Sequence, residues 1–121
     1  MKKCLVVDDS EAIRNIARLI LTDLNFEIVE AEDGGAALEK CRRDMPDAIL
    51  LDWHAPVLNG VDFVRYLRGE RNGARPVVIV SSAERNADDV AQALEAGADE
   101  FVLKPFDRES LEETLSQVGL I

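Results

Sequence analysis

A chain of 121 residues has the length of one domain and can bury one full hydrophobic core. Hydrophobic residues make up 47% of it and charged residues 31%, a mixture typical of soluble globular proteins and unlike disordered ones. The net charge of −10 argues against direct nucleic-acid binding, which depends on basic side chains that neutralise phosphates. Only four apolar residues follow Lys2 and Lys3, too few for a signal peptide or a membrane span, so we expect a cytoplasmic protein without membrane insertion.

Five short apolar runs alternate with longer segments of helical periodicity. We expect strands at Cys4–Val7, Glu27–Ala31, Ala48–Leu51, Val77–Val80 and Glu100–Leu103. The first, third and fourth runs lack polar alternation, which is typical of central strands covered by helices on both faces. The second run is more mixed, and it predicts an edge strand.

The segments between the strands carry apolar residues at helical spacing. The first helix follows Ser10, a candidate N-cap, and its apolar stripe consists of Ile13, Ile16, Ala17, Ile20, Leu21 and Leu24. Further helices are expected at about Gly34–Arg43, Gly60–Arg68 and Ala87–Ala96, with a fifth after Asp107. Cys4 and Cys41 lie in apolar patterns without a CxxC pair, so we interpret them as buried thiols.

Five strand–helix units with right-handed crossovers predict an α/β fold. We expect a doubly wound (βα)5, flavodoxin-like three-layer sandwich with a parallel sheet in the order 2-1-3-4-5, formed by a single domain over residues 1–121. In this order the direction of winding reverses between the first and third strands, and ligands of such sheets bind at that reversal.

Three aspartates follow these two strands. Asp8 and Asp9 come directly after the first strand, and Asp52 follows the third, so their carboxylates should meet at one edge of the sheet. At ~4 Å, each pair would repel by roughly 4 kcal/mol in an effective dielectric near 20, which favours a bound divalent cation. Ser81, Ser82 and Lys104 end the fourth and fifth strands at the same edge. A cation, an ammonium and a carboxylate nucleophile suit phosphoryl transfer to Asp52.

The order of these residues resembles the receiver domain of bacterial two-component response regulators, of the stand-alone CheY-like kind, over the whole chain. The resemblance rests on Asp8-Asp9-Ser10, Asp52-Trp53-His54-Ala55-Pro56, Asn59-Gly60, Ser81, Phe101 and Lys104-Pro105-Phe106. It implies a phosphoprotein of a two-component phosphorelay rather than an enzyme, with at most slow self-dephosphorylation.

The resemblance also implies roles for single residues. Asp52 would accept a phosphoryl group from a sensor histidine kinase or a histidine phosphotransfer protein. Mg²⁺ would be bound by Asp9, Asp52 and the backbone carbonyl of His54, with Asp8 acting directly or through water. Lys104 would bind a phosphoryl oxygen, and the peptide bond before Pro105 would be cis.

Two further residues would form the switch. Ser81 would turn toward the phosphoryl group and the Phe101 ring would rotate inward behind it. Because the stretch from Pro76 to Gly97 is one residue longer than usual in the family, Ser82 is an alternative to Ser81. Phe101 lacks the hydroxyl of the more frequent tyrosine, and Ala55 is smaller than the usual hydrophobe, often methionine.

The resemblance places the output on the surface of the fourth helix, fifth strand and fifth helix. Its candidate residues are Gln92, Glu95, Phe101, Arg108 and Glu112. With no output domain attached, the expected output is contact with a downstream protein such as a flagellar switch, a kinase or a phosphorelay member. We expect a monomer, with dimerisation on phosphorylation as an alternative. We interpret Trp53 as a partly exposed ring and His54 as an exposed loop group.

Three alternatives remain at the level of sequence. A Mg²⁺-dependent phosphohydrolase with an aspartyl nucleophile usually has a second acid two residues later, where this chain has His54. A degenerate receiver would act by binding alone. A flavodoxin-like FMN protein is disfavoured, because Asp8 and Asp9 would repel the phosphate of the cofactor.

Overall fold

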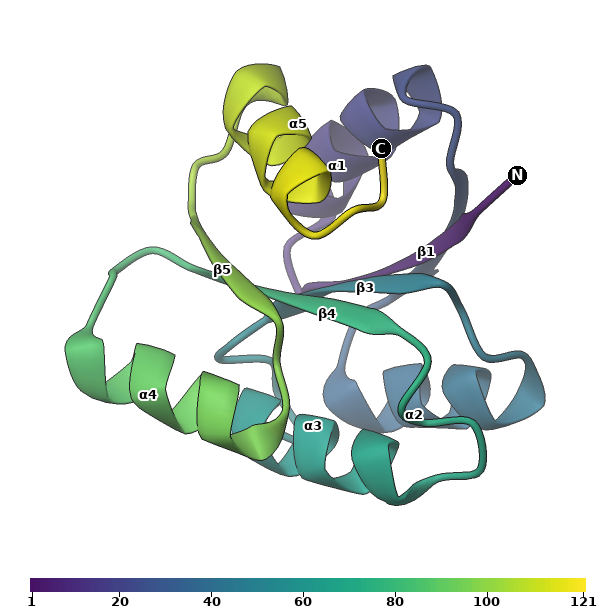
Figure 1. Cartoon of the computed structure of the whole chain (residues 1–121), viewed down its shortest axis with the longest axis vertical. Helices are drawn as coiled ribbons and strands as arrows, with labels where there is room; N and C mark the ends of the chain where they lie inside the picture. Colours follow the sequence, from purple (N-terminus) through teal and green to yellow (C-terminus); the bar gives the residue numbers. More distant parts are fainter.

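The computed structural model describes residues 1–121, and it has the predicted fold (Figure 1). The strands are β1 (Lys3–Val7), β2 (Glu27–Ala31), β3 (Ala48–Asp52), β4 (Val77–Ser82) and β5 (Glu100–Leu103). All neighbouring strands pair in parallel, and the sheet has the order β2-β1-β3-β4-β5. The mixed strand β2 is an edge strand, as its sequence predicts.

Five helices cover the two faces of the sheet. They are α1 (Glu11–Asp23), α2 (Gly34–Arg43), α3 (Gly60–Gly69), α4 (Ala87–Ala96) and α5 (Arg108–Gln117). Helices α1 and α5 pack on one face and α2, α3 and α4 on the other, which gives three layers (Figure 1). Every helix begins after a side chain that caps its first amides; the caps are Ser10, Asp33, Asn59, Asn86 and Asp107. None of the helices is long and apolar enough to cross a bilayer.

Alternation along the strands divides the core in two and decides which face each site residue joins. Leu5, Val7 and Leu51 belong to the cluster beneath α2, α3 and α4, whereas Val6 and Leu50 belong to the cluster beneath α1 and α5. Because successive side chains alternate between the two faces of the sheet, the last residue of a strand determines on which face the next side chain lies. Cys4 and Cys41 are both buried, and burial raises the pKa of each thiol to about 12.

Arg68, near the end of α3, joins segments that are far apart in the chain. Its guanidinium donates to the carbonyl of Gly97 at the end of α4 at 3.1 and 2.8 Å, and to the carbonyls of Gly73 and Pro76 at 2.9 and 2.8 Å. It also pairs with Asp99 at 3.1 Å. A single side chain thus satisfies three backbone acceptors, two in the α3–β4 connection and one at the end of α4.

Replacing Arg68 by alanine is therefore expected to lower the free energy of unfolding by roughly 2 kcal/mol, because partly buried carbonyls lose a charged donor. Urea unfolding followed by circular dichroism measures this. Arg65→Ala is the matched control, since Arg65 is exposed on the same helix. Equal stability of the two variants would contradict the assignment.

Candidate functional site

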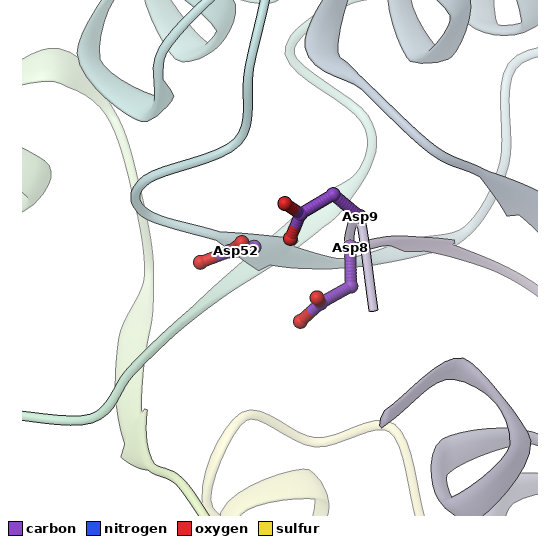
Figure 2. A group of neighbouring side chains, drawn as sticks. All are labelled: Asp8, Asp9 and Asp52. Carbon is purple, nitrogen blue, oxygen red and sulfur yellow. The ribbon is translucent and has the colours of Figure 1, made fainter. Parts of the chain in front are cut away.

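The three aspartates gather at the carboxyl edge of the sheet, where β1 and β3 end. Asp8 and Asp9 directly follow β1, and Asp52 is the last residue of β3. One carboxylate oxygen from each lies within 4.8 Å of the other two. Figure 2 shows the three side chains at the ends of these neighbouring strands. Asp8 and Asp52 are buried, whereas Asp9 is exposed.

Both the backbone and the carboxylate of Asp8 have polar partners. Its backbone N–H donates to the carbonyl of Ala31 in β2 at 3.1 Å. Its Oδ1 accepts a hydrogen bond from the backbone N–H of Ser10 at 2.9 Å, and its Oδ2 lies 2.6 Å from the Lys104 ammonium. Lys104 is the only polar partner of this buried Oδ2, so the oxygen keeps a lone pair with which it can bind a cation.

Lys104 lies between the two buried carboxylates. Its Nζ is 3.1 Å from Oδ1 of Asp52 in addition to the contact with Asp8, and its side chain is only 15% exposed. Burial by itself would lower the pKa of Lys104, but hydrogen bonding and charge interaction with Asp8 and Asp52 outweigh it and raise this pKa. Lys104 is therefore positively charged at neutral pH.

The donor set fits one Mg²⁺ ion. Three carboxylates and one ammonium leave a formal charge of −2, which a single divalent cation neutralises. The three carboxylate oxygens lie within 4.8 Å of one another, near enough for one small cation to be held among them. Hard oxygen ligands are those that Mg²⁺ prefers, and the exposure of Asp9 leaves room for coordinated water.

Ser81 and Ser82 face opposite sides of the sheet. Ser81 pairs in register with Asp52, so its side chain lies on the face toward α1 and α5, which it shares with Asp52. Its Oγ donates to the carbonyl of Leu51 at 3.3 Å, a long bond. Ser82 lies on the other face, and its Oγ accepts from the backbone N–H of Glu84 at 3.4 Å. Both serines are buried.

Phe101 lies beneath α4 and is only 5% exposed. The guanidinium of Arg85, in the β4–α4 loop, lies over the ring at 5.8 Å from its centroid. The expectation that Phe101 lies on the partner surface is therefore wrong for this conformation, because the ring packs in the core.

The other residues of the expected partner surface divide into two groups. Gln92 and Glu95 are exposed on α4. Arg108 and Glu112, on α5, are also exposed, but Arg108 forms ion pairs with Glu112 and with Asp23 of α1. Because Arg108 bridges α5 to α1, it belongs to a different part of the surface from α4.

The β3–α3 loop differs from expectation at Trp53. This ring is buried at 5% exposure, not partly exposed, because it packs beside Gly60, where a Cβ would lie 2.3 Å from the ring atom Cε3. His54 is exposed, as expected, and its backbone N–H donates to Oδ1 of Asp52 at 3.2 Å. Ala55 is buried.

Three backbone or side-chain features complete the site. The Lys104–Pro105 peptide bond is cis. Val57, exposed in the β3–α3 loop, has a φ of 70°, which is costly for a β-branched residue and is not visible in the sequence. Arg14 of α1 donates to the backbone carbonyl of Asp8 at 2.7 Å. No sequence signal distinguishes Arg14 from Arg18 on the same helix.

Comparisons with known proteins agree with this geometry. Residues 4–116 match the family model described as the response regulator receiver domain. The chain is 34% identical over 110 residues to the phosphate regulon transcriptional regulatory protein PhoB of Escherichia coli, which covers 91% of this chain and 48% of that protein. The chain therefore spans about half the length of that relative.

Solved structures extend the likeness to the whole fold. The chemotaxis protein CheY4 of Vibrio cholerae has a TM-score of 0.92 at 32% identity, and the match covers 98% of each chain. The receiver domain of the sensor histidine kinase PA1611 from Pseudomonas aeruginosa has a TM-score of 0.87 at 30% identity, covering 96% of this chain and 95% of that one. That structure has a magnesium ion coordinated in its active-site cleft.

Proposed function

Because the chain belongs to the response regulator receiver domain family, we propose that it is a phosphorylation-dependent signalling protein in which Asp52 is the phosphoryl acceptor. The observation that carries the proposal is the position of the Asp52 carboxylate. One of its oxygens lies within 4.8 Å of oxygens of two further carboxylates, and its Oδ1 is 3.1 Å from the Lys104 ammonium. This arrangement provides a nucleophile beside both a cation site and a fixed positive charge.

In the proposed reaction, a carboxylate oxygen of Asp52 attacks the phosphorus atom while the bond between phosphorus and the donor breaks. Asp8, Asp9 and Asp52 would hold Mg²⁺ with the backbone carbonyl of His54, and the ion would neutralise charge on the transferred phosphoryl group. Lys104 would bind a phosphoryl oxygen, since Asp8 and Asp52 occupy only two of the three N–H donors of its ammonium. The 6% exposure of Asp52 limits access of water to the product.

We propose Ser81, not Ser82, as the switch hydroxyl, because only Ser81 shares the face of Asp52. Its long bond to the carbonyl of Leu51 is weak, so exchange for a charge-assisted bond to a phosphoryl oxygen favours the rotation. We propose that the Phe101 ring changes position in the same transition, for which it must separate from Arg85. The proposed output surface is accordingly the exposed part of α4, including Gln92 and Glu95.

The proposed partners are a sensor histidine kinase or a histidine phosphotransfer protein as donor, and a downstream protein as target. We propose a cytoplasmic protein, because the ATP that ultimately supplies the phosphoryl group is cytoplasmic. We also propose a monomer, with dimerisation on phosphorylation as the alternative. A phosphohydrolase is disfavoured because His54, at the position of the second acid, is exposed and presents its backbone N–H, not its ring, to Asp52.

Two steps of titration test the proposal. Addition of Mg²⁺ is expected to change the fluorescence of Trp53, the single tryptophan, because it directly follows Asp52. Addition of acetyl phosphate should then add one phosphoryl group to the intact mass, and EDTA should prevent this. A protein that neither binds Mg²⁺ nor becomes labelled would refute the proposal in favour of a receiver that acts by binding alone.

The two serines provide a matched pair for the switch. Ser81→Ala is expected to leave labelling by acetyl phosphate intact while abolishing the phosphorylation-dependent change in chemical shifts of α4. Ser82→Ala should keep that change. The reverse result would assign the switch to Ser82.

A further inference from the structure

We propose that Arg14 is a positioning residue of the acidic cluster: by holding the backbone carbonyl of Asp8, it fixes the Asp8–Asp9 peptide and so raises the affinity of the site for Mg²⁺. The inference rests on the proposed function, since it concerns the cation of the same site. Arg14 does not touch the carboxylates themselves, and it lies one helical turn beyond the N-cap of α1.

All three guanidinium nitrogens of Arg14 have polar partners, which hold the side chain in place. One guanidinium nitrogen donates to the carbonyl of Asp8 at 2.7 Å, and Nε donates to Oε1 of Glu30 at 3.3 Å. The remaining nitrogen lies 3.9 Å from the carboxylate of Glu32. The side chain is only 11% exposed, so the guanidinium is held between α1, β1 and β2 by charged partners.

The Asp8 carbonyl belongs to the peptide unit that leads into Asp9. The other polar groups of Asp8 are already bound: its N–H to Ala31, and its carboxylate to Ser10 and Lys104. Fixing the carbonyl therefore sets the plane of the Asp8–Asp9 peptide. This peptide places the Cα of Asp9, the point from which the exposed Asp9 side chain extends toward the cluster. Partners that orient a ligand in this way commonly contribute tenfold or more to metal affinity.

Arg18 offers an internal comparison. It lies one turn further along α1 and pairs with the same Glu30 carboxylate at 3.0 Å, but its other hydrogen bond goes to Asn15. Removing either arginine removes one positive charge from the same region. Coulomb's law alone predicts that losing a positive charge tightens the binding of a cation. The positioning role predicts instead that Mg²⁺ binding becomes weaker, and only when Arg14 is removed.

The experiment measures the dissociation constant for Mg²⁺ by isothermal titration calorimetry, with thermal unfolding in EDTA as the structural readout. Arg14→Met keeps the apolar stem and removes the donors, and it is expected to raise the dissociation constant about tenfold. Arg18→Met should leave the dissociation constant unchanged or lower it slightly. Arg14→Lys, which restores one donor, should recover part of the affinity.

The outcomes separate the two proposals. The positioning role is overturned if Arg14→Met binds Mg²⁺ at least as tightly as the unmodified protein. It is also overturned if Arg18→Met loses as much Mg²⁺ affinity as Arg14→Met. Failure of the unmodified protein to bind Mg²⁺ overturns the proposed function and this inference together. If Arg14→Met does not fold in EDTA, Arg14→Lys and Arg18→Lys make the same comparison, and equal affinities for these two overturn the positioning role.

Discussion

Asp52→Asn is expected to abolish labelling by acetyl phosphate and, in the absence of Mg²⁺, to make the protein more stable. An amide is not a competent nucleophile for phosphoryl transfer, so the loss should be complete. The amide oxygen can still accept the hydrogen bond from the backbone N–H of His54, which preserves the loop.

The gain in stability follows from the balance of charges around Asp52. Its carboxylate is repelled by those of Asp8 and Asp9 and attracted by Lys104 alone. Removing it should raise the free energy of unfolding by about 1 kcal/mol in EDTA. In millimolar Mg²⁺ the order should reverse, because the unmodified protein gains binding energy that the variant largely loses.

Intact-mass spectrometry and urea unfolding check these two expectations. Asp62→Asn is the matched control, because it removes an exposed aspartate outside the cluster and should remain labelled. Labelling of Asp52→Asn would place the acceptor elsewhere. A loss of stability in EDTA would mean that the ion pair with Lys104 outweighs both repulsions.

Lys104→Ala is expected to lower the free energy of unfolding by about 3 kcal/mol in EDTA, because Asp8 and Asp52 are buried and lose their shared cation. Mg²⁺ should restore part of this loss and should bind at least as tightly as to the unmodified protein, since a competing positive charge is gone. The variant should still be labelled by acetyl phosphate but should no longer change shape on labelling.

The pH dependence has a definite sign. The pKa of Lys104 is raised above the ordinary value of 10.5, so its stabilising contribution is fully present below that pH and is lost as pH rises through the folded-state pKa. The difference in stability between Lys104→Ala and the unmodified protein should therefore be constant near neutrality and shrink above pH 10.5. Lys2→Ala, which removes a lysine at the opposite edge of the sheet, is the control for this pH dependence.

If Lys104→Ala still changed shape on labelling, the role of Lys104 in coupling phosphorylation to the shape change would be refuted.

Much of the fold was predictable because its signals are local. The apolar runs and helical stripes predicted all five strands and helices, and the alternation of strands with helices predicted a parallel sheet. The strands β3 and β4 differ from the prediction only in extending through Asp52 and Ser82, polar residues that join the ladder because their neighbours are paired.

The burial of Trp53 and Phe101 was not predictable from the same signals. Both are aromatic residues beside polar ones, and their exposure depends on what packs over them. Trp53 is covered because Gly60 leaves space for its ring, and Phe101 is covered by α4 and Arg85. Such contacts join residues that are distant in the chain, so no local pattern contains them.

The sequence by itself determined the fold class and the meeting of Asp8, Asp9 and Asp52 at one edge, because strand polarity carries the residues that end parallel strands to the same place. Only the tertiary structure decided that Ser81 shares the face of Asp52, that Arg14 and not Arg18 holds the Asp8 carbonyl, and that Arg68 joins α3 to α4. These choices depend on register and on the reach of long side chains, which are set only when the layers pack together.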